Sequence, residues 1–190
     1  MGNAVASSFV WKRETQPVGD EDEDDGHVCL PIELSSDATA PIRATADAAG
    51  FDLCASNDVI LPPQSQWIRV NTGVKMAIGA ESVKQHMGGN TVVYGQIRAR
   101  SGLTSKGIDA FHGTVDADYR GEIIVLVKNT TDAIFDLKRG TRIAQLLFSV
   151  ALVPKLVEHD DIAAFETMRG DRGFGSTGDS VVVAHVDEAV

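Results

Sequence analysis

Short runs of branched aliphatic residues, separated by turn-forming residues, dominate this 190-residue chain from His27 onward. Val and Ile favour pleated, half-buried surfaces, and Pro, Gly, Asn and Asp between the runs favour turns. No long run has the period of an amphipathic helix, and only a turn or two of helix is expected near Ser101–Lys106. The regular spacing of short strands predicts an all-β barrel or sandwich. The strand candidates are Val28–Leu34, Asp58–Leu61, Ser65–Ile78, Thr91–Arg98, Glu122–Asn129, Ala133–Leu137 and Thr141–Leu152.

The length and charge pattern predict one folded domain with extensions. At 190 residues and 43% hydrophobic residues, the chain can bury one sizeable core. Residues 1–26 hold seven acids and two bases, which is half of the formal net charge of −10. Their acidic run, Asp20–Asp25, repels itself and stays solvated. We expect 1–26 to be a disordered acidic arm that aids solubility or docks a partner, 27–165 to be the β domain, and 179–190 to be a tail.

Several classes of function are disfavoured by composition. Nucleic-acid binding favours a basic face, which this acidic chain lacks. No apolar run approaches the roughly 20 residues of a membrane span. The only cysteines, Cys29 and Cys54, make neither a disulfide scaffold nor a zinc site. With no secretory signal pattern at the start, we expect a cytoplasmic or nuclear protein that is not secreted.

A glycine-rich segment, Arg169–Gly178, carries two arginines, one aromatic ring and two adjacent hydroxyls. Arginine offers planar donors that suit phosphate oxygens, and glycines let backbone N–H groups approach an anion. It is not a P-loop, because it lacks the lysine and no buried strand precedes it. The segment indicates either a lid over a phosphorylated ligand or a disordered tail.

Four further segments combine polar groups with small residues in this β protein: Ala49–Ala55, Arg98–Leu103, Gly113–Gly121 and Arg142–Leu147. Followed by the glycine-rich segment, they resemble the ordered motifs of the trimeric dUTPase family, which hydrolyses dUTP to dUMP and pyrophosphate. The most specific parts of the match are Asp116–Gly121 and Arg169–Gly178. The resemblance implies a single-domain β-barrel or distorted jelly roll.

The resemblance also implies roles around the nucleoside. Asp116 is similar to the general base that activates water for attack on the α-phosphate, work that a carboxylate within hydrogen-bond reach can do. Tyr119 resembles the residue that packs on the deoxyribose and leaves no room for a 2′-hydroxyl. The hairpin Gly107–Gly113 is expected to read uracil with its backbone. Its closest base contact is expected at Ala110, and the neighbouring substrate-binding residues are Thr114 and Val115.

Phosphate and metal contacts follow from the same resemblance. Arg100, Ser101 and Gly102 resemble the phosphate-binding loop, and Gln145 resembles a further phosphate contact. Asp52 resembles an acid that helps hold Mg²⁺ through water. Mg²⁺ normally keeps several waters and binds few carboxylates besides substrate phosphates.

The family likeness assigns residues 166–178 as a mobile lid that completes a neighbouring subunit's site. A homotrimer with shared sites, binding dUTP, is therefore expected. In the lid, Arg169 would meet the γ-phosphate and Phe174 would stack over uracil. Its remaining substrate contacts would be Gly175, Ser176 and Thr177.

Two other functions stay open. A dCTP deaminase shares the fold, but the intact Asp116–Tyr119 sequence favours phosphate hydrolysis. A binding or signalling module that has lost catalysis would be expected to lack Asp116, Tyr119 or the lid arginine. Ala99 stands where the family usually has proline, and the loop Gly79–Asn90 is long. That loop and the acidic arm are candidate contacts for a protein partner.

Overall fold

The computed structural model describes residues 28–80, 83, 90–168 and 170. The predictions for the acidic arm, for most of the Gly79–Asn90 loop and for residues 171–190 lie outside this range. The chain divides into two compact units, residues 1–154 and 155–190. In the described part of the second unit, the one regular element is a 3₁₀ turn, Ile162–Ala164, which Asp161 caps.

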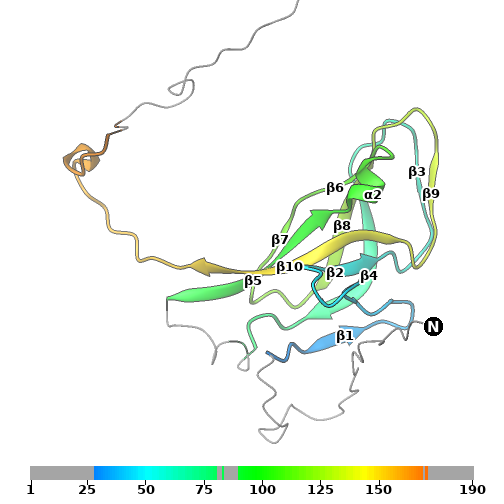
Figure 1. Cartoon of the computed structure of the whole chain (residues 1–190), viewed down its shortest axis with the longest axis horizontal. Coiled ribbons are helices and arrows are strands. Elements are labelled where there is room, and N and C mark those ends of the chain that lie inside the picture. Colours follow the sequence, from blue (N-terminus) through cyan, green and yellow to red (C-terminus); the bar gives the residue numbers. More distant parts are fainter. Residues whose placement is uncertain (1–27, 81–82, 84–89, 169, 171–190) are drawn as a thin grey trace, which may run out of the picture. The chain divides into compact units, whose positions relative to one another are not determined.

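The regular structure described in the first unit is almost wholly antiparallel strand (Figure 1), which confirms the all-β prediction. One four-stranded sheet has the order β1 (Ile32–Leu34), β4 (Ile68–Met76), β8 (Glu122–Asn129) and β6 (Ile108–Ala110). The other has the order β2 (Phe51–Cys54), β10 (Arg142–Leu152), β5 (Thr91–Ala99) and β7 (Thr114–Val115). A separate two-stranded ribbon joins β3 (Val59–Leu61) to β9 (Phe135–Leu137).

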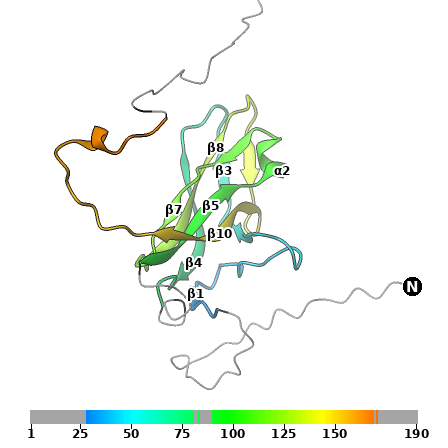
Figure 2. The same cartoon turned by 60° about the vertical axis from the view of Figure 1, so that its left-hand side comes forward.

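The core lies between the inward faces of these sheets. Along β8 every second side chain is buried, and Val125 and Val127 are fully enclosed. The period of two is what a strand with one face on a core requires. Residues from β4, β5 and β10 complete the same apolar cluster. Figures 1 and 2 both place the ribbon and the short helix α2 (Ser101–Thr104) at one end of the fold, away from β1.

The longer predicted strands are present, and so are the short β1, β3 and β9, whereas β2, β6 and β7 were not predicted. The candidate Val28–Leu34 pairs only over the three residues of β1. The strands β2, β6 and β7 are two to four residues long and carry polar or small residues. Runs this short have no readable alternation, so their strand character depends on the neighbours with which they pair. These missed strands lie in or beside the predicted functional motifs.

A bulge in β4 sets the start of β8. The register moves from Asn71 opposite Ile124 to Lys75 opposite Glu122, which leaves extra residues on β4. Within the bulge, Gly73 has φ +69°, a conformation that side-chain-bearing residues rarely adopt. A Cβ there would lie 2.8 Å from the Cβ of Ala38. The bulge therefore requires glycine at this position.

Across the described ranges, no helix is long and apolar enough to span a bilayer.

Candidate active site

Asp52 is the centre of a buried charged cluster. It lies on β2 with 1% of its surface exposed. Its carboxylate accepts hydrogen bonds from Arg100, from Arg142 Nη1 at 3.0 Å and from Gln145 Nε2 at 3.3 Å. Burial, and next the charge of Arg142, lower the pKa of the Arg100 guanidinium from its ordinary value. Because two cations share one carboxylate, the cluster keeps a net positive charge, which suits an anionic ligand.

A bulge in β10 brings two of these partners to Asp52. Arg142 and Gln145 are three residues apart, and a regular strand would direct their side chains to opposite faces. The register shifts between Arg142 and Ala144, so that Ile143 is the extra residue. Gln145 then lies opposite Asp52 on one side and opposite Arg98 on the other. Arg142 had no separate role in the sequence interpretation, because its contact with Asp52 depends on this bulge.

The predicted phosphate loop begins beside the same cluster. Arg100 is the N-cap residue of α2, and its carbonyl accepts from the N–H of Leu103 at 2.9 Å. Ser101 and Gly102 are exposed in the first turn. A Cβ on Gly102 would meet no atom within 4 Å. An exposed hydroxyl, open space and a half-buried arginine therefore lie together, as a phosphate-binding site requires.

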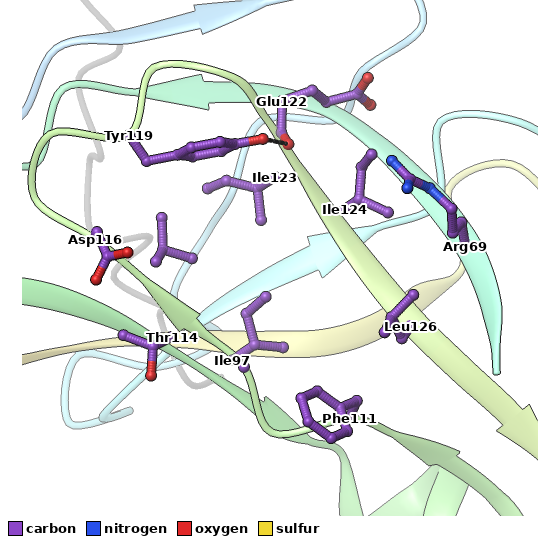
Figure 3. A pocket seen from close by; sticks show the side chains of 12 residues that line it. Arg69, Ile97, Phe111, Thr114, Asp116, Tyr119, Glu122, Ile123, Ile124 and Leu126 are labelled. Carbon is purple, nitrogen blue, oxygen red and sulfur yellow. Dashed lines mark hydrogen bonds between the residues drawn. The ribbon is translucent and has the colours of Figure 1, made fainter.

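A pocket of about 310 Å³ holds most of the predicted nucleoside-binding residues (Figure 3). Tyr119 and Asp116 lie on one side of it, and Phe111 lies at another edge. The volume is near the lower limit for small-molecule sites. The residues that line it are Arg69, Ile97, Phe111, Gly113, Thr114, Val115, Asp116, Tyr119, Glu122, Ile123, Ile124 and Leu126.

Asp116 and Tyr119 are the two ends of a single turn. The Tyr119 N–H donates to the Asp116 carbonyl at 3.1 Å. The Arg120 side chain donates to the carbonyls of Ala117 and Tyr119, each at 2.8 Å, which fixes the turn. The Asp116 carboxylate is exposed and has no hydrogen-bond partner among the described residues. It is therefore free to accept a proton from water in the pocket.

The hydroxyl end of the Tyr119 ring lies against Gly121. The three atoms nearest to a Cβ built on Gly121 all belong to the Tyr119 side chain, with Cζ at 2.6 Å. The Tyr119 hydroxyl donates to the Glu122 carbonyl at 2.9 Å (Figure 3). The ring can hold this position only because residue 121 has no side chain.

Gly121→Ala should therefore displace the Tyr119 ring and lower kcat/KM by at least about tenfold, since small misplacements at a reacting centre have large effects. Steady-state kinetics with the nucleotide that the family resemblance implies, together with the melting temperature, will measure this. In a Tyr119→Ala background the added methyl has room, so Gly121→Ala should cause no further loss. An equal loss in both backgrounds would contradict the contact.

The pocket and the Asp52 cluster do not meet within one chain. Val115 lies opposite Gly95 in the pairing of β5 with β7. Arg100 follows the end of β5, five residues after Gly95, a separation of about 17 Å at the rise of an extended strand. Asp116 lies past Val115, on the side away from Arg100. A triphosphate at Asp116 therefore cannot also lie on the Arg100–Gly102 loop of the same chain.

One residue predicted to contact the base, Ala110, does not line this pocket, whereas its neighbour Phe111 does. Ala110 is buried, with 3% exposed. The Phe111 ring packs edge-to-face on Trp67 at 5.7 Å between centroids. The lining residues to which the sequence interpretation gave no individual role are Arg69, Ile97, Phe111, Glu122, Ile123, Ile124 and Leu126. Those on β8 had a signal that could have been read. The apolar residues of this strand occupy both faces, whereas a solvated face would carry polar ones.

The lid residues cannot be placed. Arg169 and the segment 171–178 lie outside the described residues, so the predicted contacts of Phe174, Gly175, Ser176 and Thr177 have no structural counterpart. Gly170 is described, with φ +58°, and its N–H donates to the Thr167 hydroxyl at 3.0 Å.

Comparisons with known proteins give one consistent result. A family model described as dUTPase matches residues 36–178. The chain is 44% identical over 142 residues to the deoxyuridine 5′-triphosphate nucleotidohydrolase of avian adenovirus 8, covering 74% of this chain and 78% of that protein. It is 38% identical over 146 residues to the rice (Oryza sativa) enzyme of the same name, covering 76% and 77%.

Solved structures agree on the fold. The dUTPase of Staphylococcus bacteriophage 80alpha with dUpNHpp is similar at a TM-score of 0.67 and 25% identity, covering 80% of this chain and 99% of that one. A point mutant of the dUTPase from phage phi11 of S. aureus, described with a structural Mg(II) ion, is similar at a TM-score of 0.60 and 22% identity, covering 71% and 99%.

Proposed function

The chain belongs to the dUTPase family, and from this premise we propose that it hydrolyses dUTP to dUMP and pyrophosphate with Asp116 as general base. The main support for the proposal is the Asp116 carboxylate. It lines the pocket, has no hydrogen-bond partner among the described residues and lies at the other end of the turn that holds Tyr119. Asp116 takes a proton from water while the water oxygen bonds to the α-phosphorus. The bond from that phosphorus to the bridging oxygen breaks, and pyrophosphate leaves.

The pocket supports nucleoside binding by its shape and lining. Tyr119 offers a flat ring for the deoxyribose face, and Ile124 lines the same pocket. At the exposed His112, backbone N–H and C=O groups suit the O4 and N3–H edge of uracil. The carbonyl of the next residue, Gly113, is taken by the Ile97 N–H at 2.8 Å. Phe111 adds a ring at the pocket edge. Cytosine presents the opposite hydrogen-bonding polarity on that edge, so a backbone-lined pocket of this kind discriminates between the two bases.

The triphosphate is assigned to Arg100, Ser101, Gly102 and Gln145, with Arg142 as a further cation beside them. Support comes from the positive cluster around Asp52 and from the open space at the start of α2. Arg169 and Phe174–Thr177 are assigned, from the family likeness alone, to a lid that closes over the nucleotide and excludes bulk water.

A homotrimer with shared sites accounts for the separation between the pocket and the phosphate loop. Because about 17 Å of strand separates Val115 from Arg100, one chain cannot present Asp116 and Ser101 to the same triphosphate. A second copy can supply the Arg100–Gly102 loop to the first copy's pocket. Closed rings of identical subunits are a common way to build such heterologous contacts.

Mg²⁺ fits this chain as a cofactor held by the substrate and by water. The described residues include no group of three or more His, Cys, Asp or Glu side chains that could hold a metal. Both oxygens of Asp52 already accept hydrogen bonds from Arg100, Arg142 or Gln145, so the carboxylate is not suited to direct ligation, although Oδ2 has only one partner. It can act through a bound water, and the triphosphate supplies the other ligands. When bound, Mg²⁺ neutralises phosphate charge and stabilises the leaving pyrophosphate.

Pyrophosphate release from dUTP, dTTP, dCTP and UTP tests the function. We expect turnover of dUTP to exceed that of the others by at least about a hundredfold, because base and sugar are both read in the pocket. EDTA should lower the dUTP rate by at least about tenfold, and added Mg²⁺ should restore it. Ammonia release from dCTP would instead indicate the deaminase, and no turnover of any nucleotide would indicate a binding module.

A further inference from the structure

The Glu122 carboxylate holds the bulge of β4. Its Oε1 accepts from the Gly73 N–H at 2.7 Å, and its Oε2 accepts from Asn71 Nδ2 at 3.0 Å. A bulge interrupts the regular ladder and leaves backbone groups without cross-strand partners. The Thr72 hydroxyl supports the same place by donating to the Ile123 carbonyl at 2.6 Å. The first two residues of β8 are thus fixed to β4 by side chains, where the ladder itself is broken.

The main chain of Glu122 faces the pocket. Its carbonyl accepts the hydrogen bond from the Tyr119 hydroxyl at 2.9 Å, which is the one hydrogen bond that the hydroxyl makes in the described part of the chain. Tyr119 is 45% exposed, so little packing restrains its ring on the open side. The position of the ring therefore depends on two contacts: its close approach to Gly121, which has no side chain, and the hydrogen bond to the Glu122 carbonyl.

From this geometry we infer that Glu122 is a positioning residue for Tyr119, which sets the preference for deoxyribose over ribose. The inference rests on the proposed function. The carboxylate fixes the start of β8 against the β4 bulge, and the carbonyl of the same residue then holds the Tyr119 hydroxyl. If the carboxylate is lost, the carbonyl and the ring can move, and the space for a 2′-hydroxyl opens.

Two substitutions at Glu122 separate this role from a general structural one. Glu122→Gln keeps an oxygen for the Gly73 N–H, and the Asn71 amide can rotate so that its oxygen accepts from the new amide. Glu122→Ala removes both acceptors. Glu33→Ala is a matched control. Glu33, on β1, forms an ion pair at 2.8 Å with Lys75 on β4, the strand that carries the bulge, and it has no hydrogen bond to Glu122 or Tyr119 among the described residues.

The test measures the ratio of kcat/KM for dUTP to kcat/KM for UTP, in competition mixtures. Glu122→Ala should lower this ratio by about two- to tenfold, the range expected for one hydrogen bond. Glu122→Gln and Glu33→Ala should leave it near the wild-type value. Tyr119→Phe should lower it by a similar factor, and the double variant Glu122→Ala/Tyr119→Phe should be no worse than Tyr119→Phe alone.

Additive losses in the double variant, or an unchanged ratio in Glu122→Ala, would overturn the inference while leaving the proposed function intact. A wild-type protein that fails to hydrolyse dUTP would instead overturn the proposed function.

A readout that does not depend on activity is available, because the chain has only two tyrosines. Protein labelled with 3-fluorotyrosine should give two ¹⁹F resonances, and Tyr94→Phe assigns the one from Tyr119. Glu122→Ala should shift or broaden the Tyr119 resonance, and Glu122→Gln and Glu33→Ala should not. A Tyr119 resonance that is identical in wild type and Glu122→Ala shows that the carboxylate does not position the ring.

Discussion

Asp116→Asn should lower kcat for dUTP hydrolysis by at least about a hundredfold, the scale expected for loss of a general base. The amide keeps the shape of the carboxylate but cannot take a proton from water. The Asp116 carboxylate has no hydrogen-bond partner among the described residues, so the substitution breaks no contact in that part of the fold. Pyrophosphate release measures the rate, and titration with an α,β-imido analogue of dUTP should show that nucleotide binding survives.

Asp118→Asn is the matched control for this prediction. Asp118 belongs to the same turn, but it does not line the pocket. Its substitution should leave kcat within a small factor of the wild type. A retained kcat above half of the wild-type value in Asp116→Asn would remove Asp116 as the base. A comparable loss of kcat in Asp118→Asn would contradict the assignment of the general base to Asp116 in particular.

Mixing two inactive variants should restore activity if each site combines two chains. Asp116→Asn lacks the base. Ser101→Asp places a negative charge where the triphosphate is expected, and because Ser101 is exposed, the fold should tolerate it. After co-refolding of equal amounts, random assembly gives about a quarter of the sites an intact Asp116 from one chain and an intact Ser101 from its neighbour.

Pyrophosphate release is measured in the co-refolded mixture and compared with each parent. Native mass spectrometry confirms that mixed oligomers have formed. A mixture of Asp116→Asn with the double variant Asp116→Asn/Ser101→Asp has no intact base and should stay inactive. If confirmed mixed trimers show no more activity than the two parents, Asp116 and Ser101 serve the same chain's site. That outcome would also contradict the distance between Asp116 and the Arg100–Gly102 loop that follows from the pairing of β5 with β7.

The spacing of apolar runs was enough to predict an all-β domain and its longer strands, β4, β8 and β10. The buried face of β4 appears as alternation, and β8 appears as a nearly continuous apolar run, so both signals are local and visible in the residues. The ordered motifs around Asp52, Arg100, Asp116 and Gln145 were enough to indicate the family, because short glycine-containing segments with fixed polar residues seldom occur together by chance.

The tertiary structure decided which of these residues meet. The bulge at Ile143 brings Arg142 and Gln145 to the same carboxylate, although their spacing on a regular strand would separate them. Asp52, which the family resemblance assigns to Mg²⁺ through water, forms ion pairs with two arginines that no local pattern predicted. Phe111, rather than Ala110, lines the pocket, because the pairing of β6 with β8 directs Ala110 into the core. A bulge shows in the pairing of two segments distant in the chain, so a strand read alone does not reveal which side chains it brings together.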